Sequence, residues 1–192
     1  GTSRKTKVVE WVDPDKLPSK LSLNLEKSGT SHADLLQLAK GIVKYSVKTG
    51  NPRFVNQLFS SVDPYGLAGQ WLTDALNPSV YTYEVSPVFS LMENVVLAEM
   101  RKIVGWDGGD GIFCPGGSMA NGYAINLARH HRFPELKEYG HSGHTRLVIF
   151  TSEDAHYSIK KLAAFLGIGT ANVYEVKVDG RGKMCVDNLE EQ

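Results

Sequence analysis

The sequence predicts an α/β fold in which a helical N-terminal segment precedes a parallel sheet with crossover helices. Up to about residue 105, apolar residues recur at helical spacing and no convincing strand occurs. From about residue 111, glycine-rich turns alternate with short apolar runs and further helical stretches. This alternation is typical of parallel strands joined by helices. A last helix begins at Asp187 just before the sequence ends, so we expect a truncated version of this fold.

Three helices are predicted up to residue 105, each with start and stop signals. Ser31 with Asp34 resembles a capping box, and the two later helices begin with a proline in the first helical position. A short extended or irregular piece is expected over residues 54–59. The start and stop signals are Ser31 and Gly50-Asn51-Pro52, Asp63-Pro64 and Asn77-Pro78, and Ser86-Pro87 and Gly105.

In the second half of the chain, the sequence pattern predicts helices and strands in alternation. The run Leu147–Thr151 is continuously apolar, which is typical of a strand buried on both faces. The predicted elements are a helix over 118–131, a loop over 140–144, a strand over 147–151, a helix over 156–166, a strand over 173–178 and a helix from 187.

The composition excludes several classes of protein. The chain has 21 Lys+Arg and 21 Asp+Glu, and this zero formal charge excludes an electrostatic nucleic-acid binder. The apolar runs are too short to cross a bilayer and no leader segment opens the chain, so we expect a cytoplasmic protein without a membrane partner. Cys114 and Cys185 are not part of a CxxC motif and have no histidine partners, so we expect two reduced thiols.

A glycine-rich turn, Pro115-Gly116-Gly117-Ser118, opens the helix predicted over 118–131. Free backbone N–H groups at such a helix start favour a phosphate, and the Ser118 hydroxyl adds a donor. An ordinary glycine turn with Ser118 as helix cap explains the same residues, and both interpretations stay open on this evidence. The turn is not a phosphate-binding loop of the Gly-Lys-Ser/Thr type, and no dinucleotide fingerprint is present.

His156 follows the predicted strand 147–151 closely. Side chains just past the carboxyl ends of parallel strands line the ligand crevice, so His156 is placed to stack on a ligand or to transfer a proton. A histidine that merely caps the next helix is the alternative. A hydrolase triad of Ser118, His156 and Asp154 is disfavoured because the nucleophile-elbow sequence is missing.

The remaining histidines and two lysines are interpreted as surface residues. The histidines lack carboxylates at metal-ligand spacing, so no metal site is expected. Lys160 and Lys161 follow His156, but their helical register turns at least one of them to solvent. The four histidines are His130, His131, His141 and His144.

Five segments carry a family resemblance that runs in order from about residue 42 to the end. They are 56–59, 81–84, 111–118 with Asn121, 150–158 and 167–170. Together they resemble the group II pyridoxal-phosphate decarboxylases, in the branch of glutamate, cysteine sulfinate and aspartate decarboxylases. The resemblance implies a type I PLP-dependent transferase fold, pyridoxal 5'-phosphate (PLP) as cofactor, and a homodimer with active sites near the subunit interface.

The resemblance also implies roles for individual residues. Gly117 and Ser118 correspond to the turn that holds the cofactor phosphate, and His156 to the catalytic histidine that stacks on the pyridine ring. Gln57 corresponds to a glutamine near the distal acid group of the substrate. Residues 1–58 then form an N-terminal helical dimerisation segment, and 59–192 the front part of the large PLP-binding domain.

Three further residues narrow the range of expected substrates. Phe59, Ser79 and Tyr81 resemble the cysteine sulfinate and aspartate side of the branch. A bulky Phe59 shortens the pocket, which favours acids one methylene shorter than glutamate. We therefore expect conversion of aspartate to β-alanine or of cysteine sulfinate to hypotaurine, with glutamate decarboxylation as the alternative. Ala120 departs from the family, which commonly has a serine there.

Several functional groups of the family lie beyond the residues that match. The Schiff-base lysine, the aspartate at the pyridine nitrogen and a substrate-binding arginine have no counterpart in these 192 residues. We expect that the rest of the enzyme was removed or that it resides in another chain of the same assembly. An aminotransferase or desulfurase of the same fold and a non-catalytic fragment are the alternatives.

Overall fold

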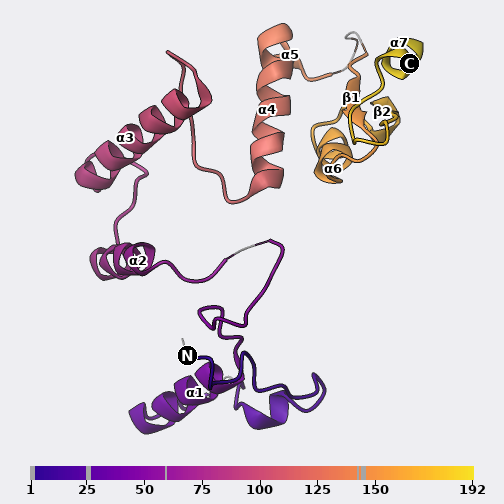
Figure 1. Cartoon of the computed structure of the whole chain (residues 1–192). Coiled ribbons are helices and arrows are strands. Elements are labelled where there is room, and N and C mark those ends of the chain that lie inside the picture. Colours follow the sequence, from indigo (N-terminus) through magenta and orange to yellow (C-terminus); the bar gives the residue numbers. More distant parts are fainter. Residues whose placement is uncertain (1–2, 25–26, 59, 142, 144–145) are drawn as a thin grey trace. The chain divides into compact units, whose positions relative to one another are not determined.

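The computed structural model describes residues 3–24, 27–58, 60–141, 143 and 146–192 (Figure 1). The chain divides into two compact units, Gly1–Glu93 and Asn94–Gln192. The boundary predicted between residues 58 and 59 concerns the complete enzyme fold and stays a prediction.

The described part of the first unit contains helices but no strand, as the sequence predicts. Ser31 Oγ accepts a hydrogen bond from the Asp34 amide at 3.2 Å, and Asp63 Oδ2 accepts from the Gly66 amide at 2.6 Å. Both predicted caps are therefore confirmed. The elements are η1 (Pro18–Lys20), α1 (His32–Tyr45), α2 (Pro64–Leu76) and the start of α3 (Pro87–Val104).

The ends of these helices follow the predicted signals with two differences. Helix α1 ends at Tyr45, before the predicted stop, because Ser46 is already extended with ψ 152°. Helix α3 begins at the predicted place, but the Ser86 hydroxyl is buried without a hydrogen-bond partner among the described residues, so it is not a side-chain cap. Asn77, at φ 45°, ends α2, and Gly105, at φ 90°, follows α3.

A buried asparagine organises the loop that follows α1. The Asn51 side chain is 3% exposed, and its Nδ2 donates to the Thr6 carbonyl oxygen at 3.0 Å. Its Oδ1 accepts from the Arg53 amide at 2.9 Å. These bonds tie the first described residues to the segment that leads to Gln57. That segment is irregular over residues 54–58, as predicted.

The second unit contains the parallel pair of strands (Figure 1). Strands β1 and β2 pair in parallel, with Ile149 opposite Val173, and α6 connects them. The predicted strand–helix–strand unit is confirmed, whereas the single turn α5 was not predicted. The elements are the rest of α3, α4 (Gly117–Arg132), α5 (Leu136–Tyr139), β1 (Ile149–Ser152), α6 (Ser158–Phe165), η2 (Thr170–Asn172), β2 (Val173–Val176) and α7 (Val186–Glu191).

The buried apolar side chains of the described residues lie in the second unit, and those of α6 and β2 form one group among them. Helix α4 packs against α6, where Gly122 lies against Leu162. The prediction that the first strand is buried on both faces is wrong, because Phe150 in β1 is 45% exposed. Strand β1 pairs with β2. The buried set is Leu97, Leu136, Leu162, Ala163, Ile168 and Val176.

The described residues contain neither a membrane-spanning helix nor a metal-binding cluster. No helix there combines the length and the apolar character that crossing a bilayer requires. No cluster of three or more histidine, cysteine or acidic side chains in the same residues is suited to a metal ion. Cys114 and Cys185 are half-buried and free, as predicted.

Candidate cofactor site

The N-terminus of α4 presents three backbone donors without partners. The first hydrogen bond of the helix runs from the Ala120 amide to the Gly116 carbonyl at 3.1 Å. Among the described residues, no group accepts from the amides of Gly117, Ser118 or Met119, and none bonds the Ser118 hydroxyl. Ser118 therefore does not cap the helix. These donors, at the positive end of a 16-residue helix, form a polar cradle suited to a phosphate.

The space beside this cradle is open. A methyl group built on Gly116 or Gly117 meets no heavy atom within 4 Å. A phosphate therefore has room to approach the backbone closely. The donors and the open space fit the phosphate of PLP, although the assignment of Gly117 and Ser118 to it stays a prediction.

His156 lies between β1 and α6, where the sequence places it. Its Nδ1 accepts a hydrogen bond from the Ser158 amide at 3.2 Å, so the ring caps the start of α6. Its ring centroid lies 4.2 Å from that of Tyr157, with the planes inclined by 36°. This bond gives the first amide of α6 an acceptor and so favours the capping interpretation, although Tyr157, which directly precedes the helix, makes no side-chain cap. It does not oppose the ligand interpretation, because the cap uses one ring nitrogen and the residue is exposed.

A partly buried hydrogen bond links the neighbour of this histidine to the helix that carries the phosphate cradle. Asn121 Nδ2, one turn after Ser118 on α4, donates to Ser158 Oγ at 2.9 Å. Ser158 is completely buried, and its amide is the donor to His156. The structure therefore brings the predicted phosphate end and the predicted ring end of the site together. Ser158 itself was missed by the sequence reasoning, and its place two residues after His156 at a helix start was the available signal.

Neither lysine near His156 is free. Lys160 Nζ lies 2.8 Å from Glu175 Oε1 in a partly exposed ion pair. Lys161 Nζ lies 4.6 Å from the centroid of the Tyr157 ring. Both side chains are exposed, which supports the interpretation of these lysines as surface residues.

The remaining histidines divide into two groups. His130 and His131 are exposed, as predicted. His141 is half-buried with its Nε2 3.4 Å from an Arg129 guanidinium nitrogen, so its assignment to the solvated surface is wrong. His144 lies outside the described residues.

The predicted substrate residues belong to the first unit. Gln57, Ser79 and Tyr81 are exposed, and Tyr81 is 90% exposed. Phe59 lies outside the described residues. The cofactor residues belong to the second unit, so the roles of these four side chains stay predictions.

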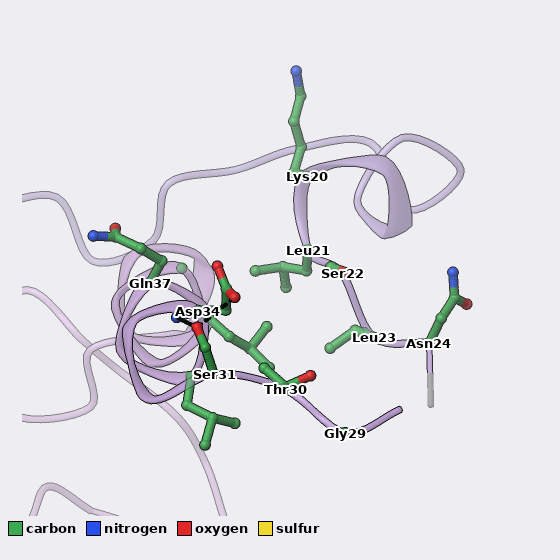
Figure 2. A pocket seen from close by; sticks show the side chains of 13 residues that line it. Lys20, Leu21, Ser22, Leu23, Asn24, Gly29, Thr30, Ser31, Asp34 and Gln37 are labelled. Atoms are coloured by element: carbon green, nitrogen blue, oxygen red, sulfur yellow. Dashed lines mark hydrogen bonds between the residues drawn. The ribbon is translucent and has the colours of Figure 1, made fainter. Parts of the chain in front are cut away.

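The first unit also contains a separate hollow (Figure 2). Residues 20–24 and 29–31 line it together with the first half of α1, and Leu21 reaches to within 2.7 Å of where a Cβ on Gly41 would lie. None of the predicted site residues lines this hollow. It is therefore not the candidate cofactor site.

Comparison with known proteins agrees with the fold. The pyridoxal-dependent decarboxylase conserved domain matches residues 14–192. Acidic amino acid decarboxylase GADL1 of Xenopus tropicalis is 58% identical over 186 residues, which cover 97% of this chain and 36% of the relative. Cysteine sulfinic acid decarboxylase of Homo sapiens is 53% identical over 192 residues, which cover the whole chain and 39% of the relative.

Solved structures show the same fold. The crystal structure of mouse CSAD matches with a TM-score of 0.94 and 51% identity, covering 98% of this chain and 40% of that one. A glutamate decarboxylase domain from Vibrio parahaemolyticus, at 22% identity, matches with a TM-score of 0.82 and shows the type I fold alone. The chain thus spans about two fifths of the length of these relatives. It belongs to the pyridoxal-dependent decarboxylase family.

Proposed function

We propose that this chain is part of a PLP-dependent enzyme that removes the α-carboxylate of a short acidic amino acid. The observation that carries the proposal is the partner-free cradle at the start of α4, joined through Asn121 and Ser158 to His156. Family membership supports the same cofactor. The two relatives compared above are named for decarboxylation of acidic amino acids and of cysteine sulfinic acid.

Each predicted site residue has a physical task in this proposal. The amides of residues 117–119 and the Ser118 hydroxyl hold the phosphate. His156 keeps the cofactor ring in plane, while its Nδ1 is occupied by the Ser158 amide. Gln57 binds the distal acid group of the substrate. The bound cofactor supplies the electron sink for loss of carbon dioxide.

The substrates that we propose are aspartate and cysteine sulfinate. Phe59, Ser79 and Tyr81 resemble the cysteine sulfinate and aspartate side of the branch. Phe59 would shorten the pocket, and one methylene changes kcat/KM by about 10- to 200-fold in a tight apolar pocket. The test compares kcat/KM for aspartate, cysteine sulfinate and glutamate on the complete enzyme. A highest value for glutamate would refute the preference for short acids.

We also propose that the enzyme works as a homodimer in the cytoplasm. The family resemblance supports the dimer, and the two free cysteines, Cys114 and Cys185, suit the reducing environment of the cytoplasm. Light scattering on the purified enzyme measures the assembly, and fractionation of source cells measures the location. A monomeric active enzyme or an organellar location would contradict this part of the proposal.

The decisive test of the cofactor is intact mass after borohydride reduction of the protein purified from its source. Reduction converts a lysine–PLP linkage into a stable adduct. We expect a polypeptide that contains this sequence, larger than 21.1 kDa, to carry one phosphopyridoxyl mass. An unmodified 21.1 kDa species alone would show that this material is not the enzyme.

A further inference from the structure

We propose that Asn121 and Ser158 are positioning residues that fix the ring of His156 relative to the phosphate cradle. The proposal rests on the function proposed above, in which His156 stacks on the cofactor. Neither residue touches the cofactor in this proposal. Their role is to set where His156 lies and which of its nitrogens carries a proton.

The first support is the burial of the Ser158 hydroxyl. Ser158 is completely buried, and Asn121 Nδ2 donates to its Oγ at 2.9 Å. A buried amide or hydroxyl that loses its partner costs about 1–3 kcal/mol. This single bond therefore holds the first residue of α6 against the second turn of α4.

The second support is the direction of the next hydrogen bond. The Ser158 amide lies 3.2 Å from His156 Nδ1, and an amide nitrogen only donates. His156 Nδ1 therefore offers a lone pair, and in the neutral ring the proton is on Nε2. A ring flipped by half a turn would place a carbon against the amide. The cap thus fixes both the orientation of the ring and its tautomer, leaving Nε2–H as the group presented to a ligand.

The third support is the path back to the phosphate end. Asn121 lies three residues after Ser118, so both project from the same side of α4. The next residue, Gly122, is where Leu162 of α6 approaches α4 most closely, since a Cβ there would lie 2.8 Å from Leu162 Cδ2. The absence of a side chain at Gly122 lets Asn121 reach Ser158. A displacement of α4 would thus be passed to His156 through two successive hydrogen bonds, from Asn121 to Ser158 and from Ser158 to His156.

The experiment compares Asn121→Ala, Ser158→Ala and the double variant in the complete enzyme. Ser158→Thr keeps the hydroxyl and serves as the conservative rescue. Asn126→Ala is the matched control, because Asn126 is also half-buried on α4 and its Oδ1 accepts from Arg129 at 2.6 Å, away from His156. Three quantities are measured on each protein: kcat and KM, the visible circular dichroism of bound PLP, and hydrogen exchange of the Ser158 amide in the apo protein.

We expect kcat to fall about tenfold in each single variant with little change in KM, because a misplaced group affects the reaction more than binding. The dichroism band should change equally in both, and the Ser158 amide should exchange about tenfold faster. The double variant should be no worse than either single variant, since both remove the same bond. Ser158→Thr should restore all three readouts, and Asn126→Ala should move none.

Two outcomes overturn the proposal. In the first, Asn121→Ala and Ser158→Ala lower the melting temperature, but their kcat, their dichroism and the exchange of the Ser158 amide equal those of the control Asn126→Ala. The second is additive losses in the double variant. Failure of the proposed function is recognised separately, because the unaltered enzyme would then bind no PLP or decarboxylate no acidic amino acid. Exchange of the Ser158 amide in the apo protein still decides the positioning role in that case.

Discussion

Replacing Gly122 by alanine tests the packing that brings α4 and α6 together. In an exposed helix interior, alanine is more stable than glycine by about 0.5–1 kcal/mol. At Gly122 the added Cβ would lie 2.8 Å from Leu162 Cδ2. Leu162 is 5% exposed, so its side chain has little room to turn away.

The size of the stability change in Gly122→Ala follows from the competition between the helix gain and the close contact with Leu162. Overpacking of a filled site costs about 1–3 kcal/mol, which outweighs the helix gain. Gly69→Ala in α2 is the matched control, because a Cβ at Gly69 meets nothing within 4 Å. We expect Gly69→Ala to stabilise its helix and Gly122→Ala to be about 1–3 kcal/mol worse than that control.

Hydrogen exchange gives the local opening free energy of α4 and α6 in the complete enzyme. Gly122→Ala should lower the opening free energy there, and Leu162→Val in the same protein should recover part of the loss by making room. If Gly122→Ala slows exchange as Gly69→Ala does in α2, the close approach of the two helices is refuted.

Three further predictions follow from the caps, the cradle and the exposed surface. Gly117→Ala and Ser118→Ala should each weaken PLP binding without loss of helix α4, because a Cβ at Gly117 meets nothing within 4 Å and the Ser118 hydroxyl has no hydrogen-bond partner among the described residues. Equilibrium titration with PLP measures this binding, and unchanged affinity in both variants would contradict the cradle. Ser31→Ala should destabilise α1 by about 0.5–2 kcal/mol, measured by exchange of α1 amides, whereas Ser46→Ala, at the other helix end, should have little effect. The 192 residues produced alone should self-associate, because Ile103 is 85% and Phe165 77% exposed; a cooperatively melting monomer in sedimentation would oppose this expectation.

The fold could be predicted wherever the pattern that specifies an element lies within a short stretch of sequence. Asp63 and Ser31 cap their helices as expected because a cap needs only residues three positions apart. The parallel pair was predictable because a strand, a helix and a strand follow one another closely. Burial of Phe150 was predicted wrongly, because burial depends on whatever packs against β1 and not on the strand itself.

The site was predictable in its residue types but not in its connections. The glycines before α4 and the position of His156 after a strand both pointed to a ligand. The bond between Asn121 and Ser158 joins residues far apart in sequence and has no local signature. The contact of His141 with Arg129 was missed for the same reason, since a histidine in a polar loop carries no sign of its partner.

The β1–α6–β2 unit has a consequence for how the chain acquires its structure during synthesis. The strands pair Ile149 with Val173, and α6 between them contacts β2, so this unit closes through short loops. Short loops cost little entropy to close and form quickly. Ser158, at the start of α6, can therefore be in place early, and His156 acquires its cap as soon as α6 forms. The part of the candidate site around His156 would then form early on the nascent chain.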